Sequence, residues 1–152
     1  MRKLLSIIGL SILLVGCSNG SASASPDPKK VPDIQADVEA DMDFTFMSNT
    51  VLLSEVNQMI VNPDDYQDKV IRLAGTFSVK QDSKNNRRIY ICEITDGTGC
   101  CPAGTAIQLF LKDETAAAPR IGSNIIVQGT MNYDISSYAM NMELRDAQLW
   151  EY

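Results

Sequence analysis

Two segments of the chain alternate apolar and polar residues in the same way. VIRLAGTFSV begins at Val70, and NIIVQGTMNY begins at Asn124. Alternation with a period of two is typical of a strand that buries one of its faces. Each segment has a glycine near its middle, Gly75 and Gly129, where glycine normally weakens a strand. The repeated glycine therefore predicts a bend or bulge that lets each strand curl.

Three further segments have the composition of strands, namely Arg88–Thr95, Thr105–Leu111 and Met140–Trp150. In the last segment, Met142 and Leu144 share one face, whereas Ala147 and Leu149 have the opposite parity. A bulge near Arg145–Asp146 would bring both pairs to the same side. The order of the five segments predicts an all-β fold with one or two short helices, a five-stranded Greek-key barrel. The connection from Lys112 to Ser123 is long enough for a turn of helix.

A different period occurs before the first of these strands. In TVLLSEVNQMIV, Thr50 to Val61, the apolar residues recur at helical spacing, as one stripe of an amphipathic helix: Leu52, Leu53, Val56, Met59 and Ile60. Asn49 or Thr50 can cap its start, and Asn62–Pro63 ends it, because proline disfavours helical geometry at the preceding residue. We expect this short helix to lie against the sheet.

The chain begins with an export signal. Arg2 and Lys3 precede a mostly apolar run from Leu4 to Val15, which is shorter than the roughly 20 apolar residues that a spanning helix needs. Small Gly16 and Cys17 follow, and then polar residues. This pattern predicts a signal peptide over residues 1–16.

Leu14-Val15-Gly16-Cys17 resembles the lipobox of bacterial lipoproteins. The resemblance implies that Cys17 is acylated on its sulfur and becomes the first residue after cleavage. Each acyl chain contributes about 0.8 kcal/mol per buried methylene, so the lipid holds the protein on a bilayer without a transmembrane helix. The expected location is extracytoplasmic, on the cell membrane or the outer membrane. An ordinary signal peptide with a chance cysteine is the alternative.

Residues 17–43 are predicted to be the lipidated N-terminus and a flexible linker, because Ser, Ala, Pro and charged residues predominate there. Its acidic end, Asp37 to Asp43, is interpreted as a solvated face. Residues 44–152 form the predicted barrel domain with its N-terminal helix. The remaining length suits one ordinary domain with a single core.

The charge and composition exclude several functions. The chain has 13 basic and 19 acidic residues, a net charge of −6, and cleavage of the signal removes two basic residues and no acidic ones. Such a charge argues against a nucleic-acid role. The chain has no histidine, which excludes Ser-His-Asp and Cys-His catalysis within it. No carboxylate pair or phosphate-binding glycine loop has a catalytic context, so we expect a protein that is not an enzyme.

Three phrases resemble OB-fold proteins: DYQDKVIRLAG and PRIGSNIIVQG look like the openings of strands one and four, and ITDGTG looks like the turn between strands two and three. The similarity covers Tyr66 to Tyr152 and implies an OB-like barrel. Another small barrel or sandwich is the alternative. Ligands of OB barrels usually lie on the face of strands two and three, framed by two loops.

By this resemblance the ligand surface would comprise Lys80, Lys84, Arg87, Arg88, Tyr90, Tyr133 and Tyr138. Its cations form a basic lip on an acidic protein, which can hold an anion. A solvated hairpin loop is the alternative interpretation. Binding of single-stranded nucleic acid would add base stacking on the aromatic rings. Alternation, however, places Phe77 in the core.

Cys92, Cys100 and Cys101 surround the ITDGTG turn. Cys92 alone is interpreted as a buried thiol within a strand. Three roles for the group stay open. One is a disulfide from Cys92 to Cys100 or Cys101, as suits an oxidising compartment. Another is a metal site for Zn(II) or Cu(I), and the third is a redox pair, although no Cys-x-x-Cys is present.

The sequence thus predicts a membrane-anchored lipoprotein of the cell envelope that acts as a binding or adaptor module. Its expected partners are the membrane, through the lipid, and an envelope protein or a small ligand. A thiol-based Zn or Cu(I) lipoprotein is the alternative, and single-stranded nucleic-acid binding is a weaker one. No cofactor is expected unless the thiols bind metal.

Overall fold

The computed structural model describes residues 36–82, 85–97, 103–135 and 141–152. The described chain is mostly β, with one sheet, one α-helix and a short 3-10 turn, η1 (Pro63–Asp65). The helix is α1 (Asn49–Val61), and the strands are β1 (Met42–Asp43), β2 (Val70–Asp82), β3 (Arg87–Thr95), β4 (Gly104–Leu111), β5 (Asn124–Asp134) and β6 (Asn141–Glu151). The expected all-β class with one or two short helices is confirmed, but residues 112–123 form turns and no helix. No helix of the described ranges is long and apolar enough to cross a membrane.

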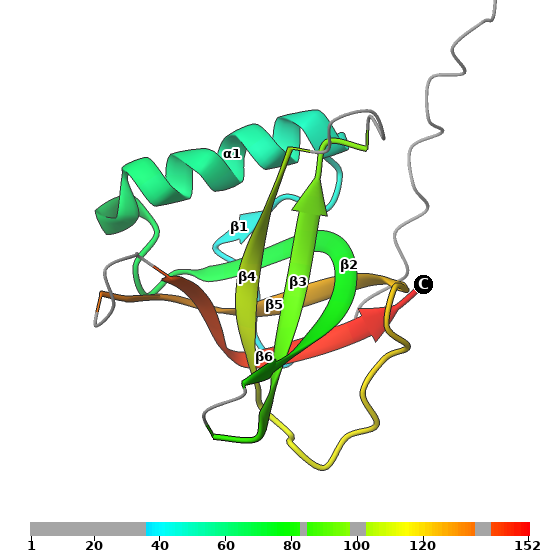
Figure 1. Cartoon of the computed structure of the whole chain (residues 1–152). Coiled ribbons are helices and arrows are strands. Elements are labelled where there is room, and N and C mark those ends of the chain that lie inside the picture. Colours follow the sequence, from blue (N-terminus) through cyan, green and yellow to red (C-terminus); the bar gives the residue numbers. More distant parts are fainter. Residues whose placement is uncertain (1–35, 83–84, 98–102, 136–140) are drawn as a thin grey trace, which may run out of the picture.

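The strand pairings run around a ring. The order within the sheet is β1-β2-β3-β4-β6-β5, and β2 also pairs with β5. β2 makes both contacts by changing partner along its length: Val70–Thr76 pair with β5, and Thr76–Asp82 pair with β3. Figure 1 shows the strong curvature of β2 that this change requires. The five strands predicted from the alternating pattern, β2 to β6, are all present, with ends shifted by a few residues at most.

β1 was not predicted. Met42 and Asp43 pair in parallel with Ile71 and Arg72, so the end of the predicted linker belongs to the sheet. Asp41 accepts a hydrogen bond from the backbone N–H of Val70 at 2.8 Å, and an Asp43 carboxylate oxygen lies 3.1 Å from the Arg72 guanidinium. The acidic segment is therefore held by hydrogen bonds and an ion pair, and is not only a solvated face.

The predicted bulge in β6 is confirmed. Gln128 of β5 pairs with Gln148, but Thr130 pairs with Arg145, so β6 has one extra residue between them. Asp146 at this place has a φ of 51°, in the left-handed region. The bulge reverses the parity of β6, as expected, and Met142, Leu144 and Ala147 are all buried in the same core.

The mid-strand glycines permit close approach of neighbouring strands. A Cβ on Gly129 would lie 2.8 Å from the carbonyl oxygen of Arg145 on the neighbouring strand. The register places the extra residue of the bulge in β6, opposite Gly129, and not at the glycine itself. A Cβ on Gly75 would overlap the Sγ of Cys92 and lie 2.8 Å from the carbonyl oxygen of Glu93. Gly75 stands next to Thr76, where β2 changes partner. Any side chain larger than the hydrogen of glycine would therefore clash at both positions.

Helix α1 covers one end of the ring of strands and packs against β3 and β4 (Figure 1). Leu52, Leu53, Val56 and Met59 are buried, as the helical spacing predicts. Ile60, expected on the same stripe, is 37% exposed. The cap is Ser48, whose Oγ accepts a hydrogen bond from the N–H of Val51 at 3.4 Å, so the assignment of the cap to Asn49 or Thr50 is wrong.

Candidate ligand-binding surface

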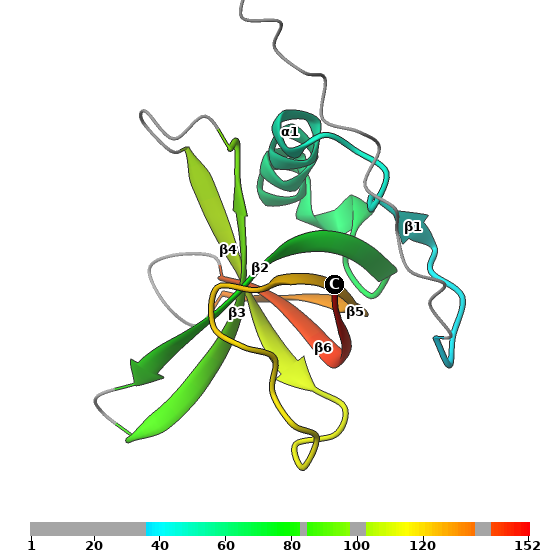
Figure 2. The same cartoon turned by 90° about the vertical axis from the view of Figure 1, so that its right-hand side faces the viewer.

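β3 and β4 separate at one end of the sheet. Their pairing runs from Thr95↔Gly104 to Tyr90↔Leu109 and stops there. Beyond this point Arg87–Ile89 stay paired with β2 alone, and Leu111 of β4 pairs with Ala147 of β6. Figure 2 shows the β2–β3 hairpin and the end of β4 leading away from each other.

A hollow of about 400 Å³ lies between the diverging strands. Its lining comes from β3, from β4 and from the segment after β4: Arg87, Arg88, Ile89, Tyr90, Gln108, Leu109, Phe110, Leu111 and Glu114. The volume is within the range of about 300–1,000 Å³ that is usual for sites of small ligands. Apolar side chains and two arginines thus share one concave surface.

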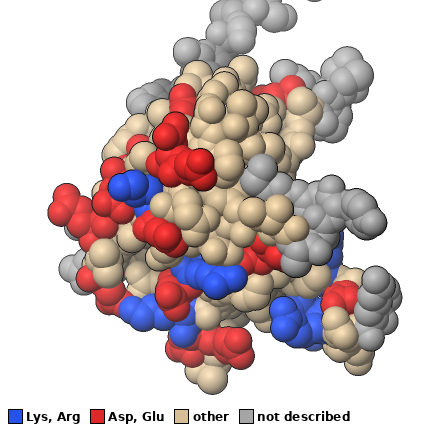
Figure 3. Space-filling view, turned by 90° about the vertical axis from the view of Figure 1, so that its left-hand side faces the viewer, with Lys and Arg blue, Asp and Glu red and all other residues tan. Residues whose placement is uncertain are grey.

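The two arginines are available to a ligand. Arg87 and Arg88 are exposed, and neither forms an ion pair with any residue in the described part of the chain. Lys80 is exposed on the neighbouring strand, where it pairs with Ile89. Glu114, also exposed, is the acid in the lining. On the face shown in Figure 3, lysine and arginine atoms lie mostly in the lower half, where acidic atoms lie among them, and the upper part is uncharged or acidic.

Of the tyrosines predicted for the ligand surface, Tyr90 lines the hollow and Tyr133 does not. The Tyr90 ring stacks on Phe77 with 5.7 Å between ring centroids, and Phe77 is in the core as predicted. Tyr90 therefore lines the hollow from its inner side. Tyr133 packs against the core and does not line the hollow, and burial raises the pKa of its phenol to about 12. Lys84 and Tyr138 lie outside the described residues.

Several lining residues were missed. Gln108 and Phe110 alternate with buried Ile107 and Leu109 in TAIQLFL, which already places the former pair on the face away from the core. This parity could have identified them. Glu114 follows the strand in a connection without such a pattern, and its place in the lining depends on how that connection folds back.

Cys92 is a free thiol in the core. It is fully buried, in agreement with its interpretation as a small apolar residue, and its Sγ lies against Gly75. Desolvation, with a smaller effect of the Glu93 charge, raises the thiol pKa from 9.0 to about 12. The neutral thiol is therefore the stable form at ordinary pH, whereas metal ligands and nucleophiles are thiolates.

Cys100 and Cys101 lie outside the described residues, as does Cys17. Within the described ranges, no group of three Cys, Asp or Glu side chains is placed to hold a metal ion. The disulfide, metal and redox interpretations of the three cysteines therefore stay predictions. Only the Cys92 part of the group has a defined environment, and it is one that disfavours thiolate chemistry.

We predict that Cys92 reacts with iodoacetamide only when the domain opens. In a Cys100→Ser, Cys101→Ser variant, alkylation near neutral pH should be slower than that of the same chain in urea by a factor of about 10³ or more, because both burial and the raised pKa suppress the thiolate. Mass spectrometry after timed quenching measures both rates. Fast alkylation of the folded variant would contradict the burial.

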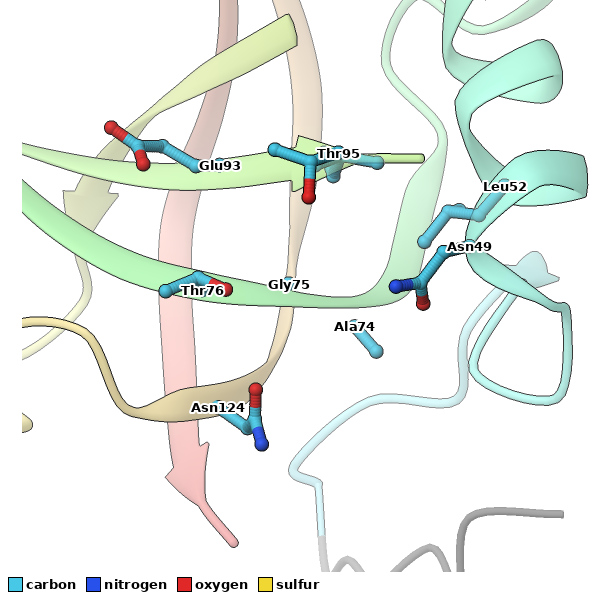
Figure 4. Close-up of a pocket in the computed structure, with 9 residues that line it drawn as sticks. Asn49, Leu52, Ala74, Gly75, Thr76, Glu93, Thr95 and Asn124 are labelled. Carbon is cyan, nitrogen blue, oxygen red and sulfur yellow. The ribbon is translucent and has the colours of Figure 1, made fainter. Parts of the chain in front are cut away.

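Two other hollows are less suited to a charged ligand. One, of about 40 Å³, lies where the start of α1 meets β2, β3 and β5, lined among others by Asn49, Glu93 and Asn124, and has room for a few water molecules at most (Figure 4). The other, of about 500 Å³, lies between β6 and residues 111–119. Its charged side chains include Lys112 and Asp37, which pair with each other at 2.6 Å and so lower the pKa of Asp37.

The hollow between β3 and β4 thus combines usable volume, apolar walls and cations without partners in the described chain. Three of the residues predicted for the ligand surface line it, Arg87, Arg88 and Tyr90. Comparison of the chain with protein-family models, with curated proteins and with solved structures gives no match.

Proposed function

We propose that this chain is a lipid-anchored, extracytoplasmic module of the cell envelope that binds an anionic partner between β3 and β4. The observation that carries the proposal is the pair of exposed arginines on a hollow of about 400 Å³ in a protein of net charge −6. Cations kept together and unpaired on an acidic protein favour recognition of an anion. The proposed role is binding, without catalysis.

An OB-like barrel is the fold we propose for β2 to β6. Supporting it, the strands pair in the ring β2-β3-β4-β6-β5, with β4 and β6 parallel and the other pairs of the ring antiparallel. A five-stranded Greek-key barrel has such an order, and its ligands usually lie on the second and third strands. β3 and β4 hold these positions. The proposed surface and the proposed fold therefore agree with each other.

The lipid anchor rests on the lipobox-like Leu14-Val15-Gly16-Cys17. We predict that Cys17→Ser abolishes incorporation of an alkyne-tagged palmitate and moves the chain from the membrane pellet to other fractions, because the acyl chains supply the membrane affinity. Gel fluorescence after labelling measures the effect, with Cys101→Ser as the matched control that keeps its label. A Cys17→Ser chain that is still labelled and sedimented would refute the anchor.

The binding role has its own test. We predict that Arg87→Glu, Arg88→Glu lowers recovery of partners in a pull-down of the tagged chain from its own envelope by about tenfold or more, since two attractive charges become repulsive ones. Lys69→Glu, Arg120→Glu makes the same change in net charge at exposed positions outside the hollow. Equal recovery by the two double variants would remove the proposed surface.

No observation on the described residues favours the alternatives over this proposal. A Zn or Cu(I) site would depend on Cys100 and Cys101, outside those residues, without help from neutral Cys92. Binding of single-stranded nucleic acid could use the ring of Phe110 in the hollow, but Tyr90 stacks on Phe77, Tyr133 packs against the core, and the net charge of −6 opposes phosphate binding. Titration with single-stranded DNA at low salt separates this alternative, because phosphate binding is strongest there.

A further inference from the structure

We propose that the hollow between β3 and β4 binds an extended, acidic segment of a partner polypeptide, which adds as a strand to the edge of β3 at Arg88. This inference rests on the proposed function and narrows its ligand to one chemical class. The reason is that the β3–β4 ladder stops at the hollow, so that strand edges as well as cations face it, and an extended peptide complements both.

The register shows which backbone groups of β3 face the hollow. The N–H of Asp96 donates to the carbonyl oxygen of Ala103 at 3.1 Å, so Asp96 faces the β4 side. Because facing alternates along a strand, Tyr90 and Arg88, which have the same parity, face that side too. Tyr90 is paired with Leu109, the last pair of the ladder. Arg88 is the next residue to face this side, and it lies beyond the last β3–β4 pair.

The opposite wall presents a second such strand edge. The N–H of Lys112 donates to the carbonyl oxygen of Ala147 at 3.1 Å, so Lys112 faces β6 and Leu111 faces the β3 side. A continued ladder would place Leu111 opposite Arg88, but the β3–β4 pairs do not extend to these two residues. Both residues line the hollow, so the strand edges beyond the last pair of the ladder face it from two sides.

The side chains decide which peptide fits. Arg88 and its neighbour Arg87 are exposed at the edge, and Lys80 lies on the adjacent strand, so acidic side chains are favoured over basic ones. Phe110 and Leu111 add apolar surface for an alternate side chain of an extended segment. A nucleic acid would use the cations but has no peptide backbone to pair with Arg88.

Selection from a library of random peptides, on the full-length chain in detergent, tests the inference without assuming a sequence. The enriched peptides should be acidic and poor in proline, which cannot donate to a ladder. A selected peptide that is N-methylated at alternate residues should bind at least about tenfold more weakly, because its side chains remain but its donors are lost. Arg87→Glu, Arg88→Glu should weaken binding similarly, and Lys69→Glu, Arg120→Glu should not.

Hydrogen exchange of single amides distinguishes strand addition from binding through the arginine side chains only, because contacts of side chains alone would leave the exchange rates of the backbone amides unchanged. The bound peptide should slow exchange at Arg88 and Leu111 and change Ile89 little, since Ile89 already faces β2. The inference is overturned if no acidic peptide is enriched, if N-methylation is without effect, or if these two amides stay unprotected. If Arg87→Glu, Arg88→Glu still lowers recovery of envelope partners in that case, only the assignment of the ligand as a peptide is refuted. If recovery is unchanged, the proposed function is refuted as well.

Discussion

Deletion of Asp146 is expected to unfold the domain or to leave it without a stable β6. Asp146 is the extra residue of the β6 bulge, and its removal would place Ala147 and Leu149 on the outer face of the sheet. Gln148 and Trp150 would turn inward instead, because a shift of one residue moves every following side chain to the other face. Loss of buried apolar contacts together with burial of an unpaired amide should cost more than about 4 kcal/mol.

Asp146→Gly is the matched control for this deletion. It keeps the extra residue and removes the side chain from a position with a φ of 51°, where glycine is at no disadvantage. We expect urea unfolding of this variant within about 1 kcal/mol of the unchanged chain. A deletion variant that unfolds at the same urea concentration as Asp146→Gly would show that β6 does not depend on the bulge.

The bulge could be predicted because it leaves a signature in the sequence. Met142 and Leu144 differ in parity from Ala147 and Leu149, and only an extra residue lets all four contact one core. Helical spacing likewise identified the four buried residues of α1, which are Leu52, Leu53, Val56 and Met59. Periodic burial is a local property of the chain, and a single sequence reveals it.

Elements that depend on distant residues could not be predicted. β1 has two residues and no period, and it exists because Asp41 and Asp43 bind partners on β2, far along the chain. The helix cap was placed too late for a related reason: Ser48, Asn49 and Thr50 are all residue types that cap or tolerate a helix start, and only the fold selects Ser48. For β1, pairing with β2 outweighs local preference.

The candidate site was predictable in part. Arg87 and Arg88 stand out as cations at the end of a strand on an acidic chain. The hollow beside them depends on where the β3–β4 ladder stops, at Tyr90↔Leu109, and on Leu111 pairing with Ala147, next to the bulge of β6. Both the core packing of β6 and the opening at β3 thus involve the register shift near Asp146. Deleting this residue should therefore impair the binding surface as well as the fold.

Gly75→Ala is expected to destabilise the domain by about 3 kcal/mol, through a clash and not through backbone strain. Its Cβ would overlap the Sγ of Cys92 and lie 2.8 Å from the carbonyl oxygen of Glu93. Cys92 is fully buried between Phe77 and Ile107 on the neighbouring strands, so its side chain has little room to move. The steric conflict should appear as a lower urea midpoint with an unchanged m-value.

Cys92→Ala separates the two contacts of that Cβ. Alone it should cost about 1–2 kcal/mol by leaving a small cavity, but in combination with Gly75→Ala the new methyl enters the vacated space. The double variant should therefore be more stable than the sum of the single effects predicts, by about 1 kcal/mol or more, and the contact with Glu93 should leave a residual cost. Gly122→Ala is the control. Its φ of 85° strains an alanine, but no atom lies within 4 Å of the added Cβ. The loss of stability from Gly122→Ala should therefore add to that from Cys92→Ala. Simple additivity of Gly75→Ala and Cys92→Ala would mean that β2 moves away from β3 at Gly75, and the tight crossing that bends β2 between its two partners would then not be fixed by this glycine.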